Sequence, residues 1–226
     1  MMIFFPVEIA IALTGVIHFS NNIFKLFLVG KNFDKNILLR FGLPAVFFSF
    51  LGAQLLLNIP NNKPLFTYFL FEKTFEIYAI KFIVGLLIMF FAVIDLIPFF
   101  NKLQFSENKL PFGGAMSGFF GGLTGAQGAL RSAFLIKYGM TKEIFIGTTV
   151  IISSFVDIIR LSVYASRLME VDLKENLSLI IITTISAILG AYIGNILLKK
   201  VTIKFLQITV SIMLVLISAV LILGII

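Results

Sequence analysis

Apolar residues form seven long runs along the chain, separated by short polar stretches. The runs cover about Val7 to Val29, Ile37 to Leu57, Phe75 to Phe100, Phe112 to Ile136, Ile144 to Leu168, Leu177 to Leu198 and Ile203 to Ile226. Each is close to the roughly 20 apolar residues that a helix needs to cross a bilayer, and backbone groups in lipid must be satisfied within the segment. The pattern predicts an all-α polytopic membrane protein with a single transmembrane domain over residues 1–226.

Composition and charge fit this class of protein and exclude several others. The chain is 59% hydrophobic and 13% charged, with a mean hydropathy of +1.08, so the lipid bilayer is its expected partner. The net charge of +7 arises mainly from Lys and Arg in short loops, where they orient helices, and we expect no nucleic-acid partner. The absence of Cys and the single His leave few groups for metal or acid–base chemistry. We therefore expect no cofactor, no bound metal and no catalytic residue.

The two halves of the chain, about 7–100 and 112–226, show an internal repeat. Pro44 to Leu56 (PAVFFSFLGAQLL) aligns without a gap with Ser186 to Leu198 (SAILGAYIGNILL). Upstream, Leu13 to Val29 resembles Met116 to Ile136 when a short gap is allowed. Internal repeats are common in secondary transporters, whose binding sites form where the repeats meet. The repeat therefore favours a transporter.

The second half opens with a segment rich in glycine, GGAMSGFFGGLTGAQGALRS. Five glycines have 4, 3, 4, 3 spacing, which on a continuous helix makes a smooth face for close packing: Gly114, Gly118, Gly121, Gly125 and Gly128. That alternative leaves Gly113 and Gly122 unexplained. Glycine is a weak helix former and suits a break at which backbone N–H groups turn toward a ligand. We therefore prefer a broken or re-entrant segment.

Basic residues in the loops favour re-entry of this segment. If all seven segments cross, the loop cations divide six against seven between the two sides, which gives no orientation signal. If the glycine-rich segment returns to the side it came from, nine cations face four, as the positive-inside rule expects. The nine are Lys31, Lys35, Lys102, Lys109, Lys137, Lys142, Lys199, Lys200 and Lys204, and the four are Lys63, Lys73, Arg167 and Lys174.

Arg131 follows the glycines and points into the protein on either interpretation. It lies three residues after Gly128, so it extends the glycine face of a continuous helix or lies in the first turn of a second half-helix. Helix N-terminal amides and an arginine together bind anions. The alternative is that Arg131 pairs with a carboxylate or extends to the interface. We predict an anion site at Arg131 with these neighbours: Thr124, Gly125, Gln127 and Gly128.

The first apolar segment carries a polar face at 3, 4, 3 spacing: Gly15, His18, Asn22 and Lys25. The repeat alignment places Lys25 opposite Arg131. We therefore predict that two cations from the two repeats hold one anion, with Asn22 beside them. His18 is a candidate carrier of a coupling proton, and a hydrogen-bonded structural His is the alternative.

A polar stripe also follows the fifth segment: Thr149, Ser153, Asp157, Arg160 and Tyr164. Asp157 and Arg160 are three residues apart, so a helix allows them to pair and neutralise each other. The functional alternative assigns Arg160 and Thr149 to anion binding and Asp157 to proton coupling.

The stretch from Gly114 to Thr149 (GAMSGFFGGLTGAQGALRSAFLIKYGMTKEIFIGTT) resembles the TauE/SafE sulfite exporter family. The similarity lies in the glycine-rich broken segment, the Gly-Met-Thr-Lys turn and the small residue and Thr of the next helix. The resemblance implies membrane transporters with two related halves, which mostly export sulfite, sulfoacetate and related small anions. The characteristic loop and the polar pair after it would be Gly118, Gly121, Gly122, Gly125, Thr148 and Thr149. The chain departs from the commoner family pattern, since no proline follows its glycines and its first half has no glycine run.

Repeat, cations and resemblance together predict a secondary transporter of the bacterial cytoplasmic (inner) membrane. Its expected substrate is a small sulfur-containing or organic anion, sulfite or sulfonate-like, moved outward with coupling to protons. A passive anion channel with the same site is the alternative, and an integral membrane enzyme is less favoured. Whether the chain forms a homo-oligomer is left open.

Overall fold

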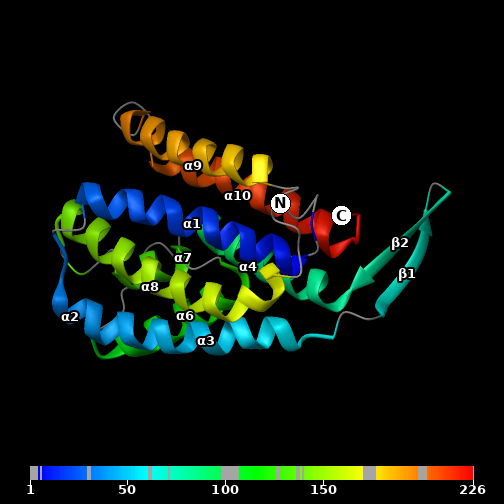
Figure 1. Ribbon diagram of the computed structural model, residues 1–226, viewed down its shortest axis with the longest axis horizontal. Helices are drawn as coiled ribbons and strands as arrows, with labels where there is room; N and C mark the ends of the chain where they lie inside the picture. Colours follow the sequence, from blue (N-terminus) through cyan, green and yellow to red (C-terminus); the bar gives the residue numbers. More distant parts are fainter. Residues whose placement is uncertain are drawn as a thin grey trace.

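Helices dominate the fold, and one β-hairpin projects from the end of the helical bundle (Figure 1). The computed structural model describes residues 5, 7–29, 32–60, 63–70, 72–97, 107–125, 128–135, 138, 140–169, 177–197 and 203–225. The first half contains α1 (Val7–Val29), α2 (Lys35–Ile37), the π-helical turn η1 (Leu38–Gly42), α3 (Leu43–Asn58), β1 (Pro64–Leu70), β2 (Lys73–Tyr78) and α4 (Ala79–Leu96). The second half contains the 3-10 turn η2 (Glu107–Lys109), α6 (Leu110–Thr124), α7 (Gly128–Leu135), α8 (Lys142–Met169), α9 (Leu177–Leu197) and α10 (Ile203–Ile222).

Three helical stretches in the described part of the chain are long and apolar enough to cross a bilayer: Ile9–Phe27, Lys35–Asn58 and Glu143–Ser166. Shorter apolar helices cover Ala79–Ile94, Ile180–Gly190 and Ile208–Ile222. The chain is thus a mostly helical membrane protein. The seven-segment layout stays a prediction.

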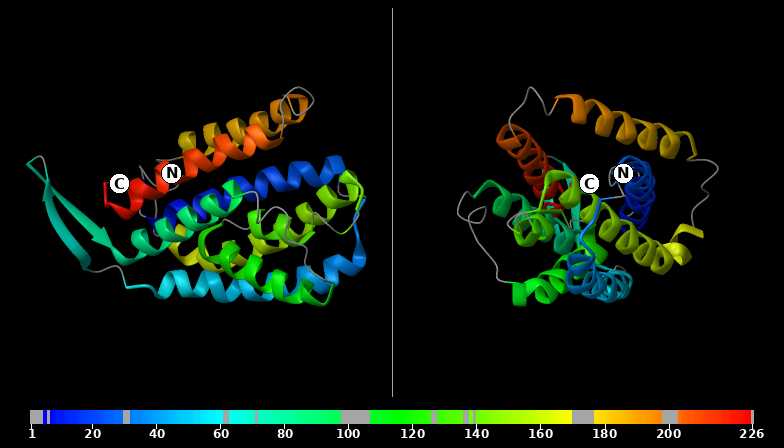
Figure 2. Two further views of the ribbon diagram at one scale, coloured as in Figure 1. Left: turned by 180° about the vertical axis from the view of Figure 1, so that it is seen from behind. Right: turned by 90° about the vertical axis from the view of Figure 1, so that its left-hand side faces the viewer.

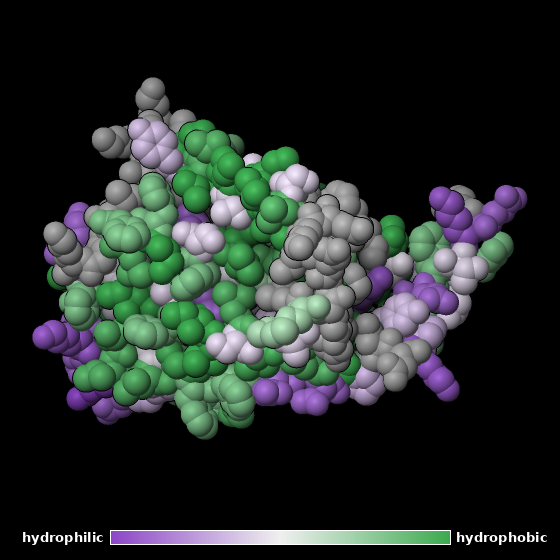
Figure 3. Space-filling model, viewed as in Figure 1, coloured by the Kyte–Doolittle hydropathy of each residue, from purple (hydrophilic) through white to green (hydrophobic). Residues whose placement is uncertain are grey.

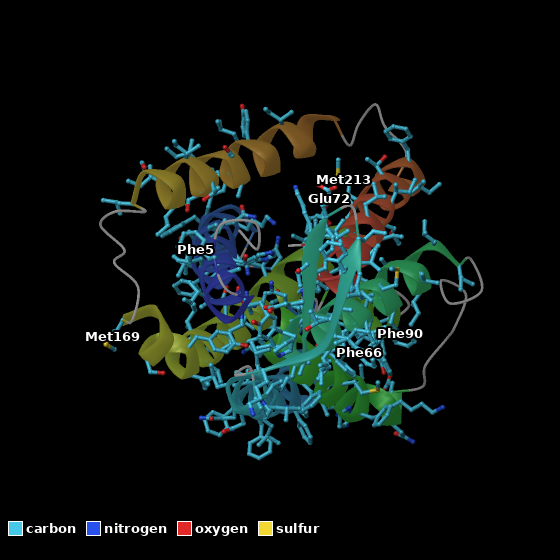
Figure 4. The ribbon with its side chains drawn as sticks, turned by 90° about the vertical axis from the view of Figure 1, so that its right-hand side faces the viewer. Phe5, Phe66, Glu72, Phe90, Met169 and Met213 are labelled. Atoms are coloured by element: carbon cyan, nitrogen blue, oxygen red, sulfur yellow. The ribbon has the colours of Figure 1, made fainter. Side chains whose placement is uncertain are left out.

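The outer faces of the helices carry exposed apolar side chains on several sides of the bundle. Phe90 of α4, Met169 of α8 and Met213 of α10 are 56%, 81% and 60% exposed (Figure 4). Hydrophobic residues cover much of the middle of one face, and many hydrophilic residues gather toward one end and on the hairpin (Figure 3). Apolar surface of this extent is stable only when another apolar phase covers it, as lipid does.

Helices from the two halves pack against each other. α3 packs mainly on α6 and also on α8, whereas α9 packs on α1. α4 pairs with α10, and α1 lies between α9 and α8 (Figure 2). α3 of the first half thus contacts α6 of the second, and α9 of the second half contacts α1 of the first. The boundary between the halves therefore lies inside the bundle.

Glycines allow α3 and α6 to approach at backbone distance. A Cβ added at Gly118 would lie 1.9 Å from the carbonyl oxygen of Ala45, and one at Gly114 would lie 2.1 Å from that of Phe41. At Gly122 the corresponding distance, to the oxygen of Ser49, is 2.1 Å. The packing face therefore uses glycines four residues apart. Gly122, which the alternative of a 4, 3, 4, 3 packing face leaves out, belongs to this face.

The hairpin corrects the expectation of an all-α chain. Pro64–Leu70 and Lys73–Tyr78 form two antiparallel strands, so α4 begins at Ala79 rather than at Phe75. This stretch is rich in the aromatic and β-branched residues that favour strands, and the rings of Tyr68 and Phe75 stack with centroids 5.2 Å apart. The Tyr68 hydroxyl donates to the carbonyl oxygen of Leu223, just after α10, at 2.6 Å.

Two apolar clusters form the core, and α8 runs through both. One contains Val156 of α8, together with Phe41 of η1 and Phe134 of α7. The other contains Tyr164 of α8 with Ile11 of α1. Between these two levels of α8 lie two charged residues, Asp157 and Arg160, both fully buried. The fold therefore places a polar layer between two apolar ones.

Candidate functional site

The Asp157–Arg160 ion pair is the centre of the polar layer. The Nε of Arg160 donates to Oδ1 of Asp157 at 2.9 Å, and neither side chain is exposed. The spacing of three residues on α8 brings the two groups together, as the sequence indicates. Because burial of an unpaired charge is costly, this pair is what allows either residue to sit in the core.

Asn22 of α1 completes the environment of the carboxylate. Its Nδ2 donates to Oδ2 of Asp157 at 2.9 Å, so each oxygen of Asp157 accepts a hydrogen bond. Asn22 is itself buried. The contact joins α1 to α8 across 135 residues of sequence and holds the carboxylate in one orientation.

The guanidinium of Arg160 reaches two glycines from other helices. Its Nη1 would lie 2.6 Å from a Cβ added at Gly125, and its Nη2 would lie 3.4 Å from one added at Gly15 of α1. Both terminal nitrogens are buried and have no hydrogen-bond partner among the described residues. Both terminal nitrogens of Arg160 thus lie next to glycines, where α1 and the end of α6 carry no side chain.

Gly125 is the residue at which α6 ends. It has φ +80° and ψ −8°, a left-handed conformation that favours glycine, and its N–H donates to Gly121 O at 2.9 Å. The hydroxyl of Tyr164 donates to the carbonyl oxygen of Gly122 one turn earlier. α7 then begins at Gly128. The glycine-rich stretch therefore contains two helices, while its re-entry into the membrane stays a prediction.

Two further cations lie close to the ion pair. Arg131 of α7 is 8% exposed and feels the charge of Asp157. Lys25 of α1 feels the charge of Arg131. His18, one turn before Asn22, is exposed but feels the charges of Lys25, Arg131, Asp157 and Arg160. The structure thus gathers candidate residues from α1, α7 and α8 into one electrostatic cluster.

The contacts of two further predicted site residues lie within their own helices. Thr124 donates its hydroxyl to the carbonyl oxygen of Phe120 at 3.0 Å, and Thr149 donates to that of Ile146 at 2.9 Å. Gly128 is exposed, with no atom within 4 Å of an added Cβ. Gln127 lies outside the described residues. The proposed role of Thr149 in anion binding stays a prediction.

Asn21 is a polar residue of α1 that the sequence analysis passed over. Its Oδ1 is buried and has no hydrogen-bond partner among the residues that the structure describes. The sequence does indicate its importance, because Asn21 is a second amide directly before Asn22 in an apolar helix. Over the same part of the chain, no group of three His, Cys, Asp or Glu side chains lies close enough together to hold a metal ion.

A helical bundle with an apolar outer surface and a charged layer inside defines an integral membrane transport protein. The comparisons with known proteins give the family. The chain belongs to the sulfite exporter TauE/SafE family, whose model matches residues 1–221, and this family consists of membrane exporters of sulfite and other anions. No curated protein and no solved structure is significantly similar to the chain.

Proposed function

We propose that the chain is a secondary transporter that exports a small sulfur-containing or organic anion, sulfite or sulfonate-like, across the bacterial cytoplasmic membrane. The observation that carries the proposal is the convergence of basic side chains from three helices. Arg160 of α8 pairs with Asp157, Arg131 of α7 feels the charge of Asp157, and Lys25 of α1 feels the charge of Arg131. Basic side chains gathered in one place attract an anion, and the substrate is that anion.

The position of the cluster supports alternating access. It lies between helices from both halves, where transporters built from repeats bind their substrates. α8, which carries Asp157 and Arg160, packs on both α1 and α3 of the first half. Movement of one group of helices against the other would then expose the anion first to one side of the membrane and then to the other. In this proposal the glycine-rich segment re-enters rather than crosses, which orients the basic loops toward the cytoplasm.

The proposal also assigns a residue to proton coupling. Both carboxylate oxygens of Asp157 accept hydrogen bonds, one from Arg160 and one from Asn22, so its geometry assigns Asp157 to holding the guanidinium in place. His18 is exposed beside the same charges, and an imidazole is the side chain that changes charge near neutral pH. We therefore assign the coupling role to His18 ahead of Asp157.

Arg131→Gln tests the proposed site directly. The purified protein should gain thermal stability on adding sulfite, thiosulfate, sulfoacetate, isethionate or simple carboxylates, and the variant should lose at least about 100-fold in affinity because a buried charge-assisted contact is removed. The control is Arg40→Gln, whose side chain is 51% exposed and lies 3.9 Å from Glu107. Equal anion affinity in the wild type and Arg131→Gln would show that the site is elsewhere.

Transport itself is measured in proteoliposomes. Sulfite loaded inside should leave faster when a proton gradient is imposed, and the Arg131→Gln vesicles should match protein-free ones. Efflux that saturates with substrate but does not depend on the proton gradient would show that transport is not coupled to protons. Efflux that shows neither saturation nor gradient dependence would indicate a passive channel.

A further inference from the structure

Arg160 has donors that the fold does not use. A guanidinium carries five N–H groups in a planar fork, and Asp157 takes the one on Nε. The edge formed by Nη1 and Nη2 faces away from this contact. Both atoms are buried without a hydrogen-bond partner in the part of the chain that the structure describes. Buried charged donors are rarely left unpaired, so this edge marks the place of a ligand.

The terminal nitrogens of this edge lie against backbone that carries no side chain. Gly125 and Gly15 flank Nη1 and Nη2, and a Cβ at Gly125 would lie 2.6 Å from Nη1. Gly125 is also where α6 ends and the chain turns toward α7. The carbonyl end of α6 favours a cation, and the amide end of α7 favours an anion. The guanidinium of Arg160 would then lie at the carbonyl end of α6, and an anion bound to it would lie at the amide end of α7.

We infer that Arg160 is a direct ligand of the transported anion, holding it through Nη1 and Nη2, and that the site selects an anion with two oxygens on one atom over a spherical anion. This inference rests on the proposed function and specifies its substrate class. A fork of two parallel N–H groups matches two oxygens of a sulfonate, sulfite or carboxylate, whereas a halide offers one acceptor centre that both N–H groups must share.

Asp157 and Asn22 are positioning residues in this arrangement. Asp157 fixes the Nε side of the guanidinium, and Asn22 fixes Asp157 from α1. The guanidinium is therefore held in its binding orientation before the anion arrives, which lowers the entropic cost of ordering this side chain on binding. Because Asn22 belongs to α1 and Arg160 to α8, the aim of the fork depends on how these two helices are packed.

The test compares anions of equal charge on the purified full chain. Methanesulfonate and acetate present two oxygens on one atom, and bromide is spherical. The wild type should bind methanesulfonate at least about tenfold more tightly than bromide. Arg160→Lys keeps the charge and removes the fork, so it should weaken methanesulfonate about 30-fold and bromide less than about threefold. Arg40→Lys, an exposed arginine outside the bundle interior, should change neither.

The outcomes separate this inference from the proposed function. If the wild type binds bromide as tightly as methanesulfonate and acetate, the fork does not select the anion, even though an anion site exists. Unchanged preference in Arg160→Lys would overturn the inference in the same way and indicate that Arg160 only neutralises the core. If the wild type binds none of these anions nor sulfite, the proposed function fails and the inference with it. Should Arg160→Lys fail to fold, the wild-type series still decides.

Discussion

Two segments line the polar layer from different halves of the chain, and they do so in different ways. α1 is an unbroken helix that presents side chains, with Asn22 bonded to Asp157 and Lys25 near Arg131. The glycine-rich segment, which the predicted repeat pairs with α1, is divided into α6 and α7, and it presents Gly125 beside Arg160 and, one turn into α7, Arg131. One segment supplies polar groups from a continuous face, and the other supplies them by ending a helix.

The difference teaches that glycines in one short stretch serve separate purposes. Gly114, Gly118 and Gly122 let α6 pack on the backbone of α3, whereas Gly125 ends the helix with a positive φ. The two interpretations of the glycine-rich segment, a packing face and a break, therefore describe successive parts of it. α1 is continuous and packs on α8 and α9, with Gly15 beside Leu161 and Arg160 of α8.

Gly118→Leu should have the largest effect, because it attacks the contact between α6 and α3. The added side chain would meet the carbonyl oxygen of Ala45 at 1.9 Å, and backbone cannot move aside cheaply. We expect a loss of about 3 kcal/mol or more of stability, seen as aggregation on size-exclusion chromatography or a Tm lowered by more than about 6 °C.

Gly128→Ala is the matched control for this experiment. No atom lies within 4 Å of an added Cβ at Gly128, and alanine is the better helix former by about 1 kcal/mol. The Tm of this variant should stay the same or rise slightly. Equal losses at Gly118 and Gly128 would mean that the close packing of α6 on α3 contributes nothing to stability.

Lys25→Gln should have an intermediate effect and tests the contribution of α1 to the anion site. Lys25 is half-buried, on the flank of the cluster, and feels the charge of Arg131. Removing its charge should weaken anion binding about tenfold, or about 1.4 kcal/mol, less than Arg131→Gln does. The check is the dissociation constant for sulfite by equilibrium binding. A larger loss at Lys25 than at Arg131 would make α1 the principal anion ligand and reverse the comparison.

His18→Gln should have the smallest effect on binding and the clearest effect on its pH dependence. His18 is exposed, so its neutral form adds little to the field that the anion feels. Protonation adds a cation to the cluster, and the wild type should bind more tightly at pH 5 than at pH 8. His18→Gln should change affinity at pH 8 less than about threefold and remove the difference between the two pH values. A variant that keeps the difference would exclude His18 as the titrating group.

Local patterns in the sequence predict much of what the structure contains. The bounds of α1, Val7–Val29, follow from the apolar run alone, and the pairing of Asp157 with Arg160 follows from helical spacing. Candidate residues on three apolar runs also share one cluster, because buried polar groups in a membrane protein face inward. Their roles in binding stay predictions.

Features that depend on partners distant in sequence could not be predicted. Nothing near Asn22 indicates that it bonds Asp157, and nothing in the glycine spacing tells which members meet α3 and which one ends the helix. The hairpin was missed for another reason. Its aromatic residues have the hydropathy of a membrane helix, and only pairing between β1 and β2, such as Tyr68 with Phe75, makes strands the better solution.

The hydrogen bond from Tyr68 to Leu223 attaches the hairpin to the chain just beyond α10. The hairpin connects α3 to α4, and α4 packs on α10, so α10 is held to this part of the chain by helix packing and by a side-chain bond. A force that pulls on the last residues would have to break the bond from Tyr68 as well as the packing of α10 on α4. The hairpin therefore adds mechanical resistance at the end of the bundle where α10 ends.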